Sequence, residues 1–215
     1  MPVPVKKKDT AERILDSAEF LFARQGYSGT TTREIAAMSG ISIQTLHHHF
    51  GSKQELFNQV LARSVIPVTV MINEHIQKMM ELDLNDENVL QEATNKLIDE
   101  LFEVLHRNPN YPLLFFRQWL EQDPELRRVE WEQLVPYLRK WVSQVESKVS
   151  EKRRRGIDLH LTFVSLSLLY WGLFTNHNFL SAFLDLDPRS KKYKERIKAH
   201  AKEATSRLLA EIPQK

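Results

Sequence analysis

The sequence predicts an all-α fold in which a small N-terminal unit of three helices precedes a larger helical domain. Apolar residues recur at helical spacing along most of the 215 residues, whereas the alternation typical of strands is rare. Serine, threonine and aspartate stand where helices would begin, and glycine or proline where they would end. The composition is that of a globular protein, with 42% hydrophobic and 27% charged residues.

We expect three segments: a flexible basic arm at 1–8, a compact helical unit at 9–55 and a second helical domain at 56–215. The arm contains two prolines followed by Lys6–Lys8. Such a segment is either a solvated tail or an arm that lies along phosphates or enters a minor groove. The net charge of the chain is only +2, so any nucleic-acid site must be a local patch.

Several cellular contexts are excluded by composition. The chain has no cysteine, which rules out disulfides and thiolate metal sites and fits a cytoplasmic location. The first residues carry charge but lack the apolar segment of a signal peptide. The longest apolar stretch, 159–174, is interrupted by threonine, serine and glycine, so we expect no membrane span.

The first helix is expected to begin at Asp9 or Thr10 and to end near Gly26. Asp9 and Glu12 have the spacing of an N-terminal cap. The apolar stripe of this helix would pack on the helices that follow it, and it consists of Ile14, Ala18, Leu21 and Phe22. We therefore assign this helix a structural role.

The residues 31–57 predict two short helices, a tight turn and the start of a third helix. The pairs Thr31–Glu34 and Ser52–Glu55 have capping-box spacing. Gly40 stands where the chain leaves the first of these helices, and Ser42 can cap the second. This is the helix-turn-helix arrangement, whose second helix can enter the major groove of DNA.

Three segments of this region resemble the N-terminal DNA-binding domain of the TetR family of transcriptional regulators: RILDSAEFLFARQGY, TTTREIAAMSGIS and TLHHHFGSKQELF. The resemblance implies a dimeric, sequence-specific DNA-binding regulator, most often a repressor of a palindromic operator that a small ligand releases. It also implies a cytoplasmic protein that associates with the bacterial nucleoid when bound to DNA. Beyond about residue 65 the likeness is architectural only, because the C-terminal domains of the family diverge with their ligands.

The resemblance implies base contacts for one side of the second short helix. Ile43, Gln44 and His47 occupy positions that face base edges in this family. Glutamine can pair bidentately with adenine, and isoleucine can contact a thymine methyl group. His47 and His48 depart from the family pattern, which usually has aromatic residues there. The pattern also puts His49 on the buried side of this helix.

Phosphate contacts are expected at the helix starts and beside the second short helix. Backbone N–H groups and the helix dipole favour an anion at the first capped helix. A lysine in a first turn opposes the dipole, so a phosphate partner would account for Lys53 better than solvent does. The three adjacent histidines point about 100° apart and cannot converge on one metal ion. The expected backbone contacts are Thr30, Thr31, Thr45, His48 and Lys53.

The remaining pattern is helical throughout. A long connector helix should be kinked or broken at Pro67 and should continue to about residue 81, before a polar loop. The charged run 151–156 reads most simply as a solvated connector. Further helices are expected over 88–107, within 111–122, over 125–151, over 159–184 and along Tyr193–Leu208.

Two C-terminal segments carry more apolar surface than one domain can cover. The stretch 159–184 is apolar almost all round, so one of its faces needs a partner. We therefore expect a homodimer with an isologous four-helix bundle. The residues expected at the interface are Leu166, Leu169, Leu173, Tyr193, Ile197, Ala204 and Leu208.

Large aromatic side chains are concentrated in the C-terminal domain. Most must be core or interface residues, but a cavity among them would suit a hydrophobic or aromatic effector of unknown identity. An ion pair with Glu121 is the more ordinary use of Arg117, although its guanidinium could also anchor a ligand. The residues expected around a ligand are Phe102, Phe116, Arg117, Trp119, Trp141, Phe163, Tyr170, Phe174 and His177.

Other classes of protein are weighed against the regulator. The sequence has no nucleophile elbow, phosphate-binding loop, dinucleotide fingerprint or zinc-protease motif, so we expect no enzyme and no cofactor. The alternative is a helical protein–protein adaptor that keeps the helix-turn-helix fold without specific DNA binding. The presence of Gln44, Thr45 and Lys53 argues against the adaptor.

Overall fold

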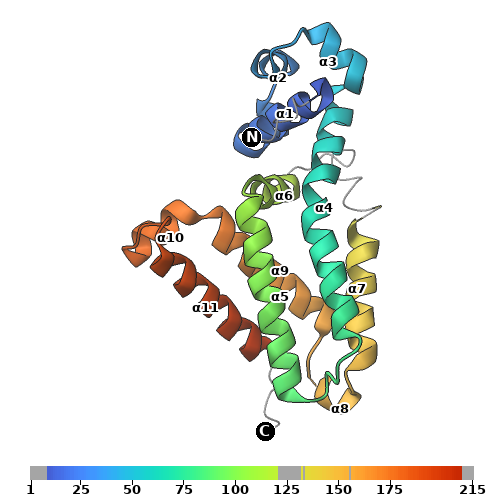
Figure 1. The fold of residues 1–215 in the computed structure, drawn as a ribbon, viewed down its shortest axis with the longest axis vertical. Helices are drawn as coiled ribbons and strands as arrows, with labels where there is room; N and C mark the ends of the chain where they lie inside the picture. Colours follow the sequence, from blue (N-terminus) through green and yellow to red (C-terminus); the bar gives the residue numbers. More distant parts are fainter. Residues whose placement is uncertain (1–8, 121–131, 133, 155, 210–215) are drawn as a thin grey trace, which may run out of the picture.

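The structure is a computed structural model that describes residues 9–120, 132, 134–154 and 156–209. The described residues form helices and no strand, which confirms the prediction of an all-α fold (Figure 1). The helices are α1 (Thr10–Gly29), α2 (Thr32–Ser39), α3 (Ile43–Phe50), α4 (Lys53–Met79), α5 (Glu87–Arg107), α6 (Asn110–Leu120), α7 (Val135–Lys148), α8 (Glu151–Arg154), α9 (Leu159–Thr175), α10 (His177–Leu184) and α11 (Lys191–Leu209).

The helices α1, α2 and α3 pack around one apolar core at one end of an elongated molecule (Figure 1). The side chains of Asp9, Thr31 and Ser42 each accept a hydrogen bond from a backbone N–H in the first turn that follows. Gly40 ends α2 in the left-handed conformation, with a φ of 66° that glycine adopts at little cost. Gly26 interrupts α1, so local side chains and glycines set the boundaries of this unit as the sequence predicted.

The helix α4 runs without a break from the N-terminal unit into the C-terminal domain. Leu56 and Phe57 are buried in the N-terminal core, whereas Val68 and Met71 belong to the C-terminal core. Pro67 lies inside the helix, so no break occurs there. Proline removes one backbone hydrogen bond, and the packing of α4 into both cores offsets that loss. The domain boundary expected between residues 55 and 56 falls within this continuous helix.

By length and composition alone, α4 could also cross a membrane. Of its most apolar window, 44% of the residues are buried inside the molecule. Packing in the two cores therefore accounts for the apolar character of α4.

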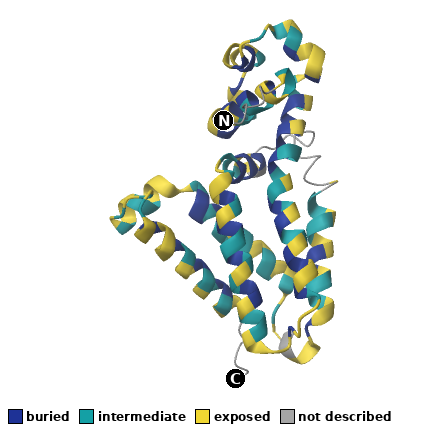
Figure 2. Cartoon of the chain, in the orientation of Figure 1, coloured by how far each residue is buried: buried dark blue, intermediate teal, exposed yellow. Residues whose placement is uncertain are grey.

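The C-terminal domain is built from α4 to α11. The helix α11 packs on α5 and α9, while α6 and α7 lie against α4 and α9. The stretch 159–184, expected as one helix, forms α9 and α10, which meet at Asn176. The helix expected over 125–151 is described from Val135 onward, and α8 occupies part of the expected charged connector. Exposed residues are concentrated on α10 and on one side of α11 (Figure 2).

Candidate nucleic-acid interface and ligand pocket

The helix α3 divides into a buried side and an exposed side. Leu46 is fully buried and Phe50 is buried beside it, which fixes the helix on the core. Gln44 and His47 are exposed, and Ile43 is half-buried between the core and the surface. The structure thus brings the three expected base-contacting residues onto one accessible helix.

The three adjacent histidines of α3 are all exposed, including His49, which the family pattern puts on the buried side. The rings of His48 and His49 meet edge to face with centroids 5.8 Å apart. Among the described residues, no group of histidine and acidic side chains could hold a metal ion. Their exposure makes all three side chains accessible from outside the protein.

The side chain of His47 is oriented by the end of its own helix. Its Nδ1 atom lies 2.7 Å from the carbonyl oxygen of Gly51. A carbonyl oxygen can only accept, so Nδ1 carries a proton and donates. In this tautomer the ring presents Nε2 as a hydrogen-bond acceptor.

Two helix starts converge near Tyr27. Lys53 Nζ at the start of α4 lies 4.1 Å from the centroid of the Tyr27 ring. Thr31 caps α2 and exchanges hydrogen bonds with Glu34. Hydrogen bonds from the side chain and backbone of Thr31 hold the pKa of the Glu34 carboxyl below its ordinary value, and the Lys53 ammonium acts in the same direction. Both helix N-termini are thus near Lys53.

The remaining expected phosphate contacts differ in accessibility. Thr45 is half-buried next to the Ser42 cap, with 2.9 Å between the two hydroxyl oxygens. Thr30 is only 1% exposed and donates from Oγ1 to the carbonyl oxygen of Gly26. Its backbone N–H also bonds internally, to Tyr27. Thr30 therefore stabilises the turn after α1 and has almost no surface to offer a phosphate.

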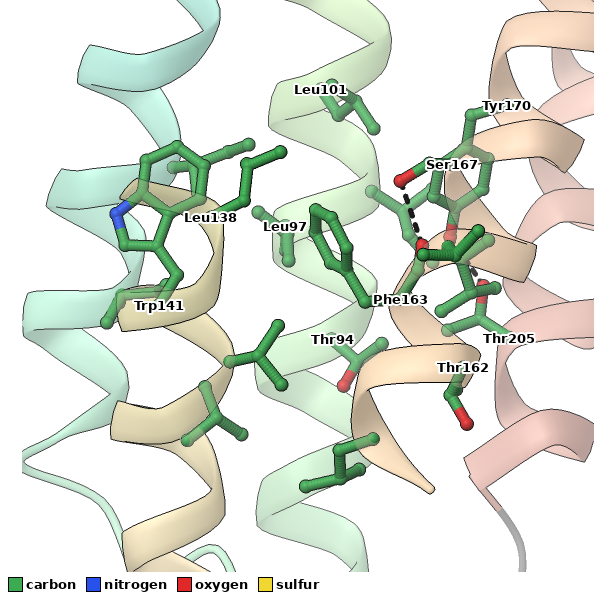
Figure 3. A pocket seen from close by; sticks show the side chains of 18 of the residues that line it. Thr94, Leu97, Leu101, Leu138, Trp141, Thr162, Phe163, Ser167, Tyr170 and Thr205 are labelled. Carbon is green, nitrogen blue, oxygen red and sulfur yellow. Dashed lines mark hydrogen bonds between the residues drawn. The ribbon is translucent and has the colours of Figure 1, made fainter. Parts of the chain in front are cut away.

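Helices of the C-terminal domain surround a cavity of about 510 Å³. Three of the expected aromatic residues line it: Trp141, Phe163 and Tyr170. Figure 3 shows Trp141 and Leu138 of α7 on one side of the cavity and Tyr170 of α9 on the other, with Phe163 and Leu97 between them. The volume lies in the range typical of small-molecule sites.

The other residues expected around a ligand lie elsewhere. Phe102 and Phe174 pack edge to face in the core with centroids 4.7 Å apart, and Phe116 packs against the same core. His177 does not line the cavity. Its pKa is lowered mainly by burial and to a smaller extent by the nearby His106. The side chain of Trp119 lies outside the described residues.

Sequence reasoning missed most of the cavity lining, because it consists of residues that also fill ordinary helical cores. Leu97 and Leu138 carry no signal that separates a cavity wall from a core. Thr205 does carry one, because it continues the buried stripe of α11 and puts a hydroxyl on an apolar face. Thr94 and Ser167 also contribute hydroxyls to the lining.

The residues expected at a dimer interface are largely turned inward. Leu173, Tyr193 and Ile197 are each less than 10% exposed within the single chain. Leu166 lines the cavity, and Leu169 packs against the C-terminal core. Ala204 is half-buried, and Leu208 is 43% exposed.

The exposed large apolar side chains of this region lie on other positions of α9 and on α10. Leu161, Val164 and Leu168 of α9 are between 47% and 64% exposed. Phe179 and Phe183 of α10 stack on each other, with ring centroids 5.7 Å apart, and both are exposed. We call these five residues the apolar face. The apolar face, and not most of the residues expected at the dimer interface, is therefore the exposed apolar surface that a partner could cover.

Hydrogen bonds tie α1 to the C-terminal helices. Arg63 of α4 donates to Asp16 at 2.9 Å and to Glu19 at 2.7 Å. Glu19 also accepts a hydrogen bond from Asn110 of α6. Farther along α6, the Arg117 guanidinium reaches the α1 backbone. Both α4 and α6 thus hold the first helix of the N-terminal unit.

Comparisons with known proteins find bacterial transcriptional regulators. Residues 14–60 match the sequence model described as "Bacterial regulatory proteins, tetR family". The chain is 26% identical over 202 residues to the probable HTH-type transcriptional regulator YttP of Bacillus subtilis (strain 168), covering 89% of this chain and 92% of YttP. It is 23% identical over 190 residues to the HTH-type transcriptional repressor NicS of Pseudomonas putida, covering 86% and 85% of the two chains.

Among solved structures, the TetR-family regulator PfmR from Thermus thermophilus shares the fold with a TM-score of 0.65. The sequence identity is 19%, and the match covers 97% of this chain and all (100%) of that chain. The similarity therefore extends through the C-terminal helices and is not confined to residues 14–60.

Proposed function

Because this chain is a transcriptional regulator of the TetR family, we propose that it binds a palindromic operator as a homodimer, represses transcription and is released by a small hydrophobic or aromatic ligand. The observation that carries this proposal is the dual position of α4. The helix contributes Leu56 and Phe57 to the core beneath α3, and its Val68, Thr69 and Ile72 line the cavity. A molecule in the cavity therefore touches the helix that supports the DNA-binding unit.

On the operator, we assign base contacts to Ile43, Gln44 and His47 of α3 in the major groove. Phosphate contacts come from Thr31 and Thr45, together with His48 and Lys53, and they position the domain without reading sequence. This assignment is supported by the exposure of Gln44 and His47 on a helix whose opposite side is buried.

Dimerisation is supported by the apolar face, because a monomer would leave these large side chains in water. In a twofold dimer the two α3 helices read half-sites about 34–36 Å apart, or a multiple of that spacing. The similarity to NicS, a transcriptional repressor, supports repression as the mode of regulation. A cytoplasmic protein that associates with the nucleoid when bound to DNA follows from this role.

Release follows from a shift between two populations. A ligand that binds more tightly to a form with mis-spaced α3 helices draws the protein away from the operator. The coupling free energies typical of such systems are about 1–3 kcal/mol. In this chain, α4 contacts the cavity directly, and Asn110 and Arg117 of α6 contact α1.

Selection from randomised double-stranded DNA at moderate salt tests this function with the purified full chain. We expect a palindrome to be enriched, with its half-sites one helical turn or a multiple apart. The matched control is the double variant Ile43→Ala and Gln44→Ala. It retains the buried Leu46 and Phe50 of α3, and we expect its selection to enrich no palindrome. If the native chain shows only salt-sensitive binding without a preferred sequence, the protein is instead the helical adaptor.

A further inference from the structure

The cavity has no charged side chain among the described residues that line it. The ionic groups on neighbouring positions are already paired: Asp99 bonds to Lys198 and Lys202, and Glu100 lies 3.1 Å from His75. Burying a carboxylate without a partner is strongly unfavourable, because the charge loses its hydration and gains nothing in return. The lining therefore disfavours an anionic ligand.

The hydroxyls at one end of the cavity have a fixed hydrogen-bond direction. Thr205 Oγ1 donates its proton to the carbonyl oxygen of Ala201 at 2.7 Å. It lies 2.5 Å from Tyr170 Oη, and since its own proton is used, it must accept from Tyr170. The phenolic oxygen of Tyr170 is then left with a free lone pair and no free proton.

The hydroxyl of Ser167, beside Tyr170 and Thr205, also has its proton engaged in a hydrogen bond. Ser167 Oγ donates to the carbonyl oxygen of Phe163 at 2.8 Å, so only its lone pairs remain for a ligand. Figure 3 shows Ser167, Tyr170 and Thr205 close together at one side of the cavity. Burial raises the pKa of the Tyr170 phenol, which keeps this group neutral. This end of the cavity thus presents hydrogen-bond acceptors.

The remaining hydroxyls do not reverse this preference. Thr69 donates to the carbonyl oxygen of Ile66. The hydroxyls of Thr94, Thr162 and Tyr111 can turn to donate or to accept, so they set no direction. The Nε1 atoms of Trp141 and Trp171 have no hydrogen-bond partner among the described residues, but both atoms are buried against protein and are not exposed to the cavity. No lining residue among those described supplies a cation.

We propose that the cavity takes an uncharged lipophilic molecule with a hydroxyl group, and that this hydroxyl donates a hydrogen bond to the phenolic oxygen of Tyr170. This inference rests on the proposed ligand release and names the chemical class of the effector. An ester of the same length lacks the donor, and the corresponding acid is ionised and unpaired. The expected order of affinity is therefore alcohol, then ester, then carboxylate.

The test compares dodecan-1-ol, methyl dodecanoate and dodecanoate on the purified full chain without DNA, each below its solubility limit. Binding is followed by calorimetry and by the fluorescence of the tryptophans that line the cavity. We expect dodecan-1-ol to bind about three- to tenfold more tightly than the ester, as one hydrogen bond predicts. Dodecanoate should bind more weakly than both.

The variant Tyr170→Phe removes the acceptor and keeps the ring. We expect it to lose about three- to tenfold in affinity for dodecan-1-ol and to keep its affinity for the ester, which also shows that it folds. The control is Tyr193→Phe, a buried tyrosine outside the cavity, which should bind all three molecules as the native chain does.

Each contrary result has a definite meaning. Dodecanoate binding as tightly as the alcohol overturns the exclusion of charge, and equal binding of ester and alcohol overturns the hydrogen-bond direction. Binding of none of the three overturns the ligand class. Operator release is measured separately. An alcohol that binds without releasing DNA contradicts the proposed release and leaves the inference about the ligand class intact. Release by dodecanoate alone supports the proposed release and contradicts the inference about the ligand class.

Discussion

Arg117 of α6 donates a hydrogen bond of 3.0 Å from Nε to the backbone carbonyl oxygen of Ala23 in α1. Its Nη2 atom donates to the next carbonyl oxygen, that of Arg24, at 2.6 Å. These carbonyls lie just before Gly26 interrupts the helix. A cation there complements the dipole and supplies donors at a helix end. Arg117 thus joins the C-terminal domain to the first helix of the DNA-binding unit.

Replacing Arg117 by methionine should loosen the DNA-binding unit without altering the cavity, because Arg117 does not line it. We expect operator affinity to fall about three- to tenfold, the effect of losing one ordinary hydrogen bond, because only part of the lost contact energy reaches the DNA-binding surface. Binding of dodecan-1-ol to the cavity should stay within about twofold. Operator titrations and calorimetry on the same preparations measure both quantities.

The matched control for Arg117 is Arg107→Met on α5. The Arg107 side chain is 79% exposed and pairs with Glu103 on its own helix, so its loss should leave operator affinity unchanged. If Arg117→Met and Arg107→Met behave alike, the bonds to Ala23 and Arg24 do not couple the two domains.

The pairing of Asp99 with two lysines predicts a pH dependence of stability. Burial acts to raise the pKa of the Asp99 carboxyl, but Lys202 and Lys198 outweigh it and hold the pKa below its ordinary value. The native chain therefore binds this proton less tightly than the unfolded chain does. The resulting stability is complete above the ordinary pKa of aspartate, about 4, and is lost as the pH falls through the folded value.

Thermal unfolding from pH 7 to pH 3 checks this expectation with the variant Asp99→Asn. The variant should be less stable than the native chain at pH 7, and the difference should shrink below about pH 4. Glu103→Gln, which removes an exposed pair within α5, is the control. A difference between Asp99→Asn and the native chain that is independent of pH would show that the lysines do not stabilise the carboxylate.

The N-terminal unit could be predicted from the sequence because its signals are local. Thr31 with Glu34 forms the predicted capping box, and Gly40 ends α2 in the conformation that its position requires. Each of these features depends on residues within one or two turns. The expected contact residues Gln44 and His47 are exposed for the same reason, since their direction follows from the buried Leu46.

The C-terminal domain could be predicted only as a set of helices. Its stripes show which residues face inward, but they do not separate a core from a cavity or from an interface. Tyr193 and Ile197 were expected at a dimer interface, and the structure buries them against α5 and α9 instead. For Arg117 the sequence offered an ion pair with Glu121 or a ligand, whereas its observed partners, Ala23 and Arg24, are more than 90 residues away. Whether a residue lies in the core, at an interface or against another domain depends on tertiary packing, which the local sequence does not encode.

Lys53→Ala should weaken binding to every DNA sequence alike. If the ammonium neutralises one phosphate, the slope of log affinity against log salt concentration should fall by about 0.9. Fluorescence anisotropy at several salt concentrations measures the slope on operator and on unrelated DNA. Lys96→Ala, in an exposed pair on α5, is the control and should leave the slope unchanged. A loss restricted to one base position would assign Lys53 to base recognition.

Leu168→Glu tests whether the apolar face forms the dimer. Leu168 is 47% exposed, so a glutamate there should be tolerated by the monomer, whereas burying its unpaired charge against an apolar partner surface should be unfavourable. We expect a monomer in sedimentation and an operator affinity lower by on the order of 100-fold, since a dimer binds two half-sites at once. Val70→Glu, at a 49% exposed position on α4, should remain dimeric. A dimeric Leu168→Glu protein would mean that the interface lies elsewhere.

Gln44→Ala should relax the base preference at one position in each half-site, because a bidentate pair with adenine is worth about 1–3 kcal/mol against the wrong base. The exposed position of Gln44 in the first turn of α3 makes a large effect on stability unexpected. Gln59→Ala on α4, which removes a glutamine bonded to Glu55, is the control and should keep the preference. Binding to a set of operators with single base changes measures both variants. Equal weakening on all of them would move Gln44 to the phosphate-contacting residues and leave Ile43 and His47 to read the sequence.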